Sequence, residues 1–397
     1  MICPPMICPP MICPPTRAPA PGSPFGSVFL GGFECSTHRR ADGRRLDLLA
    51  ATGHDRHALA DYRALARHGL LAARDGLRWH RIEAEPGRYD WSSALPLLEA
   101  AREAGMRVIW DLCHYGWPDD LDIWSEAFVS RFAAFAAAAA RQVRAVSGAP
   151  PFLCPVNEIS YWAWAGGEVG RIGPCATGCG AALKRQLVRA SLAATRAVRE
   201  VEPEARFPHA EPAIHVVGGP EAGSAAAAAA YREVQYEALD MASGRLAPDL
   251  GGGPDALDVV GLNFYPDNQW VHGGGTVPLG HHAYRPFRAL LAEAHARYGR
   301  PLLVAETGAE GSARPAWLHY VCGEVRAARA AGVPVLGICL YPILDYPGWE
   351  NERPCAVGLL SAPDEAGARR TDGPLAREIR EQRARFAGSA QEETDAA

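Results

Sequence analysis

Short apolar runs alternate with amphipathic stretches along most of the chain, from about residue 26 to residue 386. The runs are rich in Val, Ile, Leu and Phe and are bounded by Gly, Pro or charged residues, which is typical of buried β-strands. The pattern predicts eight strands, at residues 27–33, 70–79, 106–112, 151–157, 206–217, 258–265, 301–307 and 333–341.

The stretches between these runs carry apolar residues at helical spacing, and several end in Gly after a basic residue or Ala, a common helix stop. Strands that alternate with helices indicate an α/β fold with parallel strands and right-handed crossovers. We therefore expect a single (β/α)8 TIM barrel. The alternative, a doubly wound sheet, favours a G-x-G-x-x-G turn after its first strand, and "GGFECS" lacks it. The predicted helices are 55–69, 93–105, 126–148, 181–201, 225–244, 285–299, 315–332 and 375–388.

The expected barrel forms one domain over residues 25–387, because no linker rich in Pro, Gly or Ser divides it. Residues 1–24 contain "MICPP" three times, and the prolines favour extended chain, so we expect a disordered tail. Residues 388–397 read as a second, polar tail. The N-terminus lacks the basic and apolar regions of a secretory signal, and the expected location is cytoplasmic.

Composition narrows the classes of partner. The 397 residues carry a net charge of −5, with 40 Lys and Arg against 45 Asp and Glu. This balance predicts no nucleic-acid binding, and no apolar run approaches the roughly 18–20 residues that span a membrane. Cys175 and Cys179 have the spacing of a disulfide or half a metal site, but we interpret them as loop thiols. We predict no metal and no organic cofactor; a homo-oligomer remains open.

Polar side chains gather where the predicted strands end, and the carboxyl ends of barrel strands form the usual active-site face. Two carboxylates, Glu158 and Glu306, close the fourth and seventh strands. Such a pair in one pocket is the equipment for cleaving a glycosidic bond. The aromatic neighbours of Glu158 are expected to raise its pKa, and a guanidinium with a tyrosine hydroxyl to keep Glu306 ionised. The side chains expected around them are Arg74, His114, Tyr115, Asn157, Asn263, Tyr265, Tyr341 and Trp349.

Six motifs at these strand ends resemble those of glycoside hydrolase family 1, the β-glucosidase-like group of retaining (β/α)8 glycosidases: "ARDGLRWHRI", "HYGWP", "VNEI", "GLNFY", "AETG" and "LYPILDYPGW". The resemblance covers about residues 25–355. It implies that Glu158 is the acid/base and Glu306 the nucleophile. It also implies nucleophile contacts from Arg74 and Tyr265, and sugar contacts from the remaining residues named above.

The chain departs from the family at its sugar-recognition positions. Arg39 stands where the first-strand glutamine grips the outer hydroxyls of glucose, and Gly348 replaces a glutamate. A changed set of hydrogen-bonding groups should change the sugar. Two interpretations of the basic loop remain open: it binds an acidic or phosphorylated sugar, or it is a solvated loop. Its arginines are Arg39, Arg40, Arg44 and Arg45.

The leading hypothesis is a retaining β-glycosidase that hydrolyses a small O-glycoside. A second hypothesis keeps this chemistry but places a non-water acceptor beside Tyr161, Trp162 and Trp164, which makes the protein a transglycosidase. A third is a catalytically idle barrel that binds carbohydrate or another protein. Hydrolysis of aryl β-glycosides discriminates the third hypothesis from the first two.

Overall fold

The computed structural model describes residues 23–221 and 223–395. Residues 1–22, most of the tail predicted at the N-terminus, lie outside the described residues, as do residues 396–397 of the predicted C-terminal tail. The helical backbone of α12 (Gly373–Asp395) continues into the stretch expected to form that second tail.

Eight parallel strands form one sheet in the order β4-β3-β2-β1-β10-β9-β7-β5. The sheet closes where β4 meets β5: Leu153 donates its N–H to the carbonyl of Arg206 (2.9 Å), next to a parallel bridge between Phe152 and Arg206. The predicted (β/α)8 barrel is confirmed. Its strands are β1 (Phe29–Gly32), β2 (Ala72–Gly76), β3 (Arg107–Asp111), β4 (Phe152–Cys154), β5 (Pro208–Pro212), β7 (Val259–Asn263), β9 (Leu302–Thr307) and β10 (Val335–Leu340).

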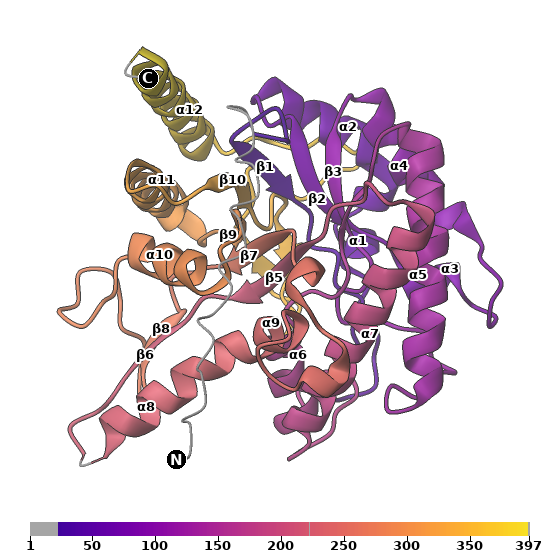
Figure 1. The fold of residues 1–397 in the computed structure, drawn as a ribbon. Coiled ribbons are helices and arrows are strands. Elements are labelled where there is room, and N and C mark those ends of the chain that lie inside the picture. The colour runs from indigo at the N-terminus through magenta and orange to yellow at the C-terminus, as the bar shows by residue number, and fades with distance from the viewer. Residues whose placement is uncertain (1–22, 222, 396–397) are drawn as a thin grey trace, which may run out of the picture.

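The helices cover the outside of this barrel, as Figure 1 shows, with α2, α4, α5 and α7 on one side and α10, α11 and α12 on the other. None of the described helices is both long enough and apolar enough to cross a membrane. Besides α12, the helices are α1 (Leu48–Ala51), α2 (His54–Arg67), α3 (Trp79–Ile82), α4 (Leu95–Glu103), α5 (Glu126–Ser147), α6 (Ile159–Trp162), α7 (Gly180–Val201), α8 (Ser224–Glu233), α9 (Glu237–Ala242), α10 (Phe287–Tyr298) and α11 (Arg314–Ala330).

Helix α5 illustrates how the sequence sets these elements. Ser125 caps its N-terminus by accepting a hydrogen bond from the N–H of Phe128, and Gly148 ends it in the left-handed conformation (φ 70°). Both are common stop and start signals, since they satisfy backbone groups that lack helical partners. The buried face, which includes Phe132, Phe135 and Ala139, packs toward the sheet and α7.

The interior of the barrel is filled by small and medium side chains from alternate strands. Leu30, Ala72, Ile109, Leu303 and Ala305 all lie there with almost no exposure. A second, larger apolar layer separates the sheet from the helices. The polar residues at the strand ends therefore rest on a closely packed floor.

The predicted fifth strand, 206–217, is wrong in its second half. Barrel strand β5 ends at Pro212, and the chain then leaves the barrel to form β6 (His215–Val217), which pairs with β8 (Gln269–Val271). The N–H of His215 donates to the carbonyl of Asn268 (3.0 Å) instead of to a barrel strand. These two strands and α8 form an arm beside the barrel mouth, at the lower left of Figure 1. A further short pair joins β11 (Tyr346–Pro347) to β12 (Pro354–Cys355).

Candidate active site

A cavity of about 1090 Å³ opens at the carboxyl ends of the barrel strands. This is at the upper end of the range for small-molecule sites, roughly 300–1,000 Å³. Two predicted residues, Arg74 and Asn263, are fully buried and bind the carboxylates from outside the cavity wall. The other predicted residues in its wall are Glu158, Glu306, His114, Tyr115, Asn157, Tyr265, Tyr341 and Trp349.

Glu306 is the second-last residue of β9, and its carboxylate accepts hydrogen bonds from a guanidinium and a hydroxyl. Arg74 donates from Nη1 to Oε1 (2.7 Å), and the Tyr265 hydroxyl donates to Oε2 (2.8 Å). These donors point one oxygen toward the floor of the barrel and fix the orientation of the carboxylate. Charge on Glu306 is thus compensated directly by a guanidinium.

Arg74 is itself fixed on two sides. It donates from Nε and Nη2 to the two oxygens of Asp111 (2.9 and 2.7 Å), and from Nη2 to Oδ1 of Asn157 (2.6 Å). A two-pronged contact of this kind requires the planar fork of Arg and could not be made by Lys. The buried arginine therefore links β2, β3, β4 and β9 at one point.

Glu158 follows β4, and the side chains that donate to it among the described residues are neutral. The Tyr115 hydroxyl donates to Oε2 (2.7 Å), and Asn263 donates from Nδ2 to Oε1 (2.9 Å). Glu158 and Tyr115 both have positive φ angles, 42° and 64°. Non-glycine residues adopt this region at a cost, and strained residues of this kind cluster at functional sites. The backbone of Glu158 is pinned by its N–H bond to the carbonyl of Ala210 (2.9 Å).

The two carboxyls differ in which of them is favoured to carry charge. Burial raises the pKa of Glu158 to about 7, the donors Tyr115 and Asn263 oppose this, and the nearby charge of Glu211 adds to it. Burial also raises the pKa of Glu306 to about 7, where Arg74 opposes the effect and Glu158 reinforces it. Since each charge disfavours the other, the pair retains a proton near neutral pH. The direct contact with Arg74 favours Glu306 as the ionised member.

His114 and Asn157 are oriented by the same network. Asn157 must present its oxygen to Arg74, so its Nδ2 faces Nε2 of His114 (3.0 Å) and the hydroxyl of Tyr115 (3.0 Å). Nε2 therefore accepts a hydrogen bond, which assigns the ring proton to Nδ1, 2.9 Å from Asp111. The network thus fixes the orientation of the imidazole ring and the partner of each ring nitrogen.

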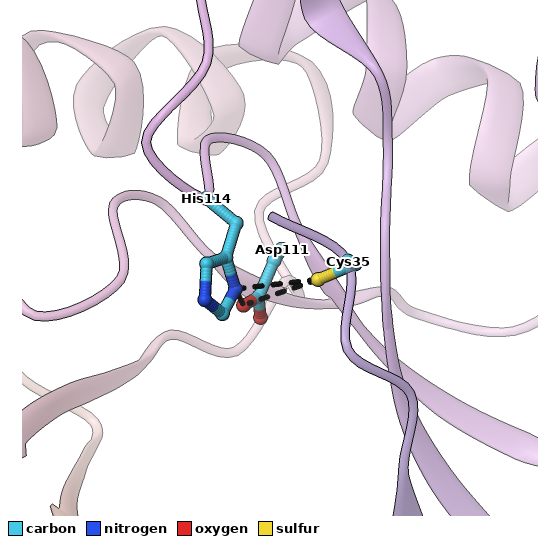
Figure 2. A group of neighbouring side chains, drawn as sticks. All are labelled: Cys35, Asp111 and His114. Atoms are coloured by element: carbon cyan, nitrogen blue, oxygen red, sulfur yellow. Dashed lines mark hydrogen bonds and ion pairs between the residues drawn. The ribbon is translucent and has the colours of Figure 1, made fainter. Parts of the chain in front are cut away.

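Figure 2 shows the side chains of Cys35, Asp111 and His114, three residue types that bind metals, pointing toward one another. Their ligand atoms lie within 4.8 Å of one another, and all three residues are buried. The guanidinium of Arg74 occupies both oxygens of Asp111, and a cation bound there would lie beside that charge. Burial raises the pKa of Cys35 well above its usual range, so its thiol stays protonated. The cluster fits a hydrogen-bonded support for His114 better than a metal site.

Aromatic side chains form one wall of the cavity. Trp349 contacts Tyr115 and Tyr161 with ring centroids 5.7 and 6.2 Å apart, and Tyr341 lies parallel to His114. Trp162, predicted beside an acceptor, is fully buried and donates to the carbonyl of Gly173 (2.7 Å). Tyr161 and Trp164 line the cavity, so two of the three predicted aromatics lie where a ligand can touch them.

Arg39 lies away from the predicted sugar site. It pairs with Asp119 at the surface (2.5 Å), with a side chain that is 39% exposed. Arg45 joins the same aspartate, and Arg40 and Arg44 contact Glu352. In the described part of the chain, the cavity wall contains none of these four arginines. These arginines form ion pairs outside the cavity, and only Arg44 among them has a mostly exposed side chain.

Several wall residues carried no signal in the sequence. Glu34, two residues after β1, is a third carboxylate in the cavity, inside the otherwise apolar "GGFECS". Farther out, Tyr231 on α8 and Trp270 on β8 extend the wall along the arm beside the barrel. Lys184 of α7 lies in the same outer part and pairs with Glu237 (2.7 Å). The arm could not be anticipated, since the sequence pattern merges β5 with β6.

Known proteins resemble this chain in fold but not in sequence. No protein-family model matches the sequence, and no curated protein matches it. Among solved structures, the family 1 β-glucosidase from Thermotoga maritima is 14% identical over 91% of this chain and 98% of its own, with a TM-score of 0.74. The same organism's β-glucosidase in complex with glucoimidazole is 15% identical over 92% and 100%, also at 0.74. The AHE enzyme from Alicyclobacillus herbarius is 19% identical over 91% and 98%, at 0.72. The chain has the fold of these three solved structures.

Proposed function

We propose that this protein is a retaining β-glycosidase that hydrolyses a small O-glycoside, with Glu306 as nucleophile and Glu158 as acid/base. The observation that carries the proposal is the unequal support of two buried carboxylates in one cavity. Arg74 and Tyr265 hold Glu306, whereas Glu158 is held by the neutral groups of Tyr115 and Asn263. Environments that separate two carboxyls in this way assign the acid and the nucleophile.

The reaction proceeds in two displacements. An oxygen of Glu306 attacks the anomeric carbon, the bond to the leaving oxygen breaks, and Glu158 gives that oxygen its proton. Glu158, now ionised, removes a proton from water, which attacks the anomeric carbon and releases Glu306. The Tyr115 hydroxyl can turn to donate to the ionised form of Glu158 or accept from the protonated form. We assign contacts with the sugar ring to His114 and Asn157, which both line the cavity.

The decisive experiment separates the roles of the two carboxyls. Glu306→Gln should abolish hydrolysis of every aryl β-glycoside while leaving the fold intact. Glu158→Ala should still cleave glycosides with a good leaving group, which needs no protonation, and should lose at least a hundredfold with a poor one. Full activity of Glu306→Gln would remove the nucleophile assignment. A wild-type protein that binds glycosides without cleaving them would favour the idle, binding-only barrel.

A second candidate activity, transfer to a non-water acceptor, is favoured by the extent of the cavity. Beyond Glu158 its wall continues through Tyr161, Trp164, Tyr231 and Trp270. Aromatic faces of this kind bind sugar rings and flat leaving groups by apolar contact. Product analysis with and without an added alcohol or sugar acceptor decides: a new glycoside formed at the expense of free sugar supports transfer.

A further inference from the structure

Glu34 enters the cavity from the side of the barrel mouth away from Glu158. It follows β1, which lies three strands from β4 and two strands from β9 in the sheet order. Its side chain lines the cavity together with His114, Tyr341 and Trp349, and the residue is only 6% exposed. The mechanism above gives this buried carboxylate no task.

No Lys or Arg side chain of the described residues pairs with Glu34. Among those residues its one hydrogen bond comes from the backbone N–H of Ser36 to Oε1 (3.0 Å). Nε2 of His114 lies 3.9 Å from Oε1, too far for a hydrogen bond, and that nitrogen accepts from Asn157. Glu306, by contrast, contacts the guanidinium of Arg74. Glu34 is thus a buried acceptor with most of its lone pairs unused by the chain.

An acceptor in this state defines the chemistry of what can lie against it. Buried polar groups are nearly always hydrogen-bonded, so a ligand that displaces water from Glu34 must supply donors. Two adjacent hydroxyls of a sugar ring match the two oxygens of a carboxylate. A phosphate or carboxylate group on the sugar has no such donors at neutral pH and is repelled by Glu34 and Glu306.

The position of Glu34 fixes which hydroxyls it meets. Glu158 has to touch the leaving oxygen at the anomeric carbon, so the opposite edge of the ring faces Glu34. In a pyranose that edge carries the 3- and 4-hydroxyls. We propose that Glu34 selects the sugar: it binds the 3- and 4-hydroxyls of a neutral glycoside and excludes acidic and phosphorylated sugars. This inference rests on the proposed glycosidase function, whose substrate class it names.

The test combines Glu34→Ala with substrates that lack one hydroxyl. On wild-type protein, removal of the 3- or 4-hydroxyl from an aryl β-glycoside should lower kcat/KM by about 10- to 100-fold, as expected for a hydrogen bond to a charged group. On the parent glycoside, kcat/KM of Glu34→Ala should fall below that of the wild type by a similar factor. With Glu34→Ala, removing a hydroxyl from the substrate should then lower kcat/KM by less than about threefold. Glu34→Gln should improve the ratio of uronide to glucoside hydrolysis at least tenfold. Equal deoxy penalties in both proteins would overturn the proposal.

Glu310→Gln is the matched control. This glutamate also lies in the cavity wall, but its carboxylate is taken up by Arg353 (2.7 Å) at the exposed rim. The deoxy penalties of this variant should equal those of the wild type. If Glu34→Ala does not fold, the wild-type series alone still decides, because equal rates on parent and deoxy glycosides contradict a contact at these hydroxyls.

A binding measurement separates this inference from the proposed function. In Glu306→Gln, calorimetry with the intact parent glycoside needs no turnover. Adding Glu34→Ala to that variant should weaken the affinity for the parent about tenfold or more and leave the affinity for the deoxy compounds nearly unchanged. If the affinities change in this way but the wild type hydrolyses no glycoside, Glu34 binds the hydroxyls and the proposed glycosidase function is wrong. If the wild type hydrolyses glycosides but Glu34→Ala changes neither kcat/KM nor affinity, the glycosidase function stands and the role of Glu34 is wrong.

Discussion

Glu158 and Glu306 are both buried, but they differ in the groups that donate hydrogen bonds to them. Glu306 touches a guanidinium, whereas Glu158 touches a phenol and an amide. Burial raises both pKa values, and the contacts with charged or neutral donors then decide how the two groups differ. The pH dependence of the reaction should therefore respond to individual donors.

Tyr115→Phe removes one of the two donors to Glu158. Because this hydrogen bond lowers the pKa of Glu158, its loss should raise that pKa and keep the acid protonated to higher pH. The alkaline limb of the kcat/KM profile should move up by about one pH unit. Tyr161→Phe, which packs against Tyr115 without bonding to Glu158, is the control and should leave the limb in place. A downward or absent movement in Tyr115→Phe contradicts the assignment of Glu158 as acid.

Arg74→Met leaves Asp111 and Glu306 buried without their cation. Breaking a buried pair from one side typically costs about 3–5 kcal/mol, so the free energy of unfolding should fall by that amount. Arg39→Met breaks an exposed ion pair and should change the free energy of unfolding by less than about 1 kcal/mol. Urea unfolding of the two variants and the wild type provides the comparison. Equal stabilities of the two variants would show that the Arg74 network is not needed by the fold.

At the scale of elements, a buried charged network joins α2 to β2. His54 lies between Asp61 and Asp75, with each ring nitrogen 2.9 Å from a carboxylate oxygen, and Phe33 stacks on the ring at 3.6 Å. Burial opposes a charge on His54, but the two carboxylates outweigh it and raise its pKa to about 9. Both ring nitrogens therefore carry protons in the folded protein.

This network should make stability depend on alkaline pH. A folded pKa of about 9 exceeds the unfolded value near 6.5, so the stabilisation is complete below about pH 6.5 and is lost as pH rises through 9. Between pH 6 and 9.5 the wild type should lose about 3 kcal/mol of unfolding free energy relative to His54→Gln. Urea unfolding at several pH values measures this difference. Parallel curves for the two proteins would mean that His54 is uncharged.

The arm formed by β6, β8 and α8 should act on the leaving group and not on the sugar. Trp270 and Tyr231 lie in the outer cavity wall, with ring centroids 6.1 Å apart. Trp270→Ala should lower kcat/KM about tenfold for glycosides with a large aromatic leaving group, since such ring contacts contribute about 1 kcal/mol beyond the area buried. The rate with a methyl glycoside should not change. A uniform loss on both substrates would indicate a general disturbance of the barrel.

The sequence predicted the barrel because strand and helix periods differ and alternate without interruption. It also predicted that Glu158 and Glu306 lie in one pocket, because both follow apolar runs that mark strand ends, and the carboxyl ends of barrel strands converge. It did not predict the switch from β5 to β6, because an apolar run looks the same whether or not the chain changes sheets. Arg39 was expected in the pocket, yet its partner Asp119 lies 80 residues away and no local pattern reveals that contact. Glu34 was missed because a single carboxylate forms no pattern.

For the molecule as a whole, the barrel brings together side chains from the ends of seven strands that are far apart in sequence. Arg74 and Glu306 are separated by 232 residues and lie 2.7 Å apart. The same fold occurs in β-glucosidases at 14–15% identity, so the architecture tolerates nearly complete change of sequence. A shared fold does not fix the reaction, and the activity has to be argued from the site.

The central claim is that Glu306 forms a covalent bond to the sugar. A panel of 2-deoxy-2-fluoroglycosides with a dinitrophenyl leaving group tests it most directly, because such compounds slow the release of a glycosyl-enzyme. Peptide mass spectrometry should find one added fluorosugar on the peptide that contains Glu306, and none in Glu306→Gln. Labelling of a different residue, or wild-type protein that hydrolyses the parent glycosides yet never carries a label, would contradict the account.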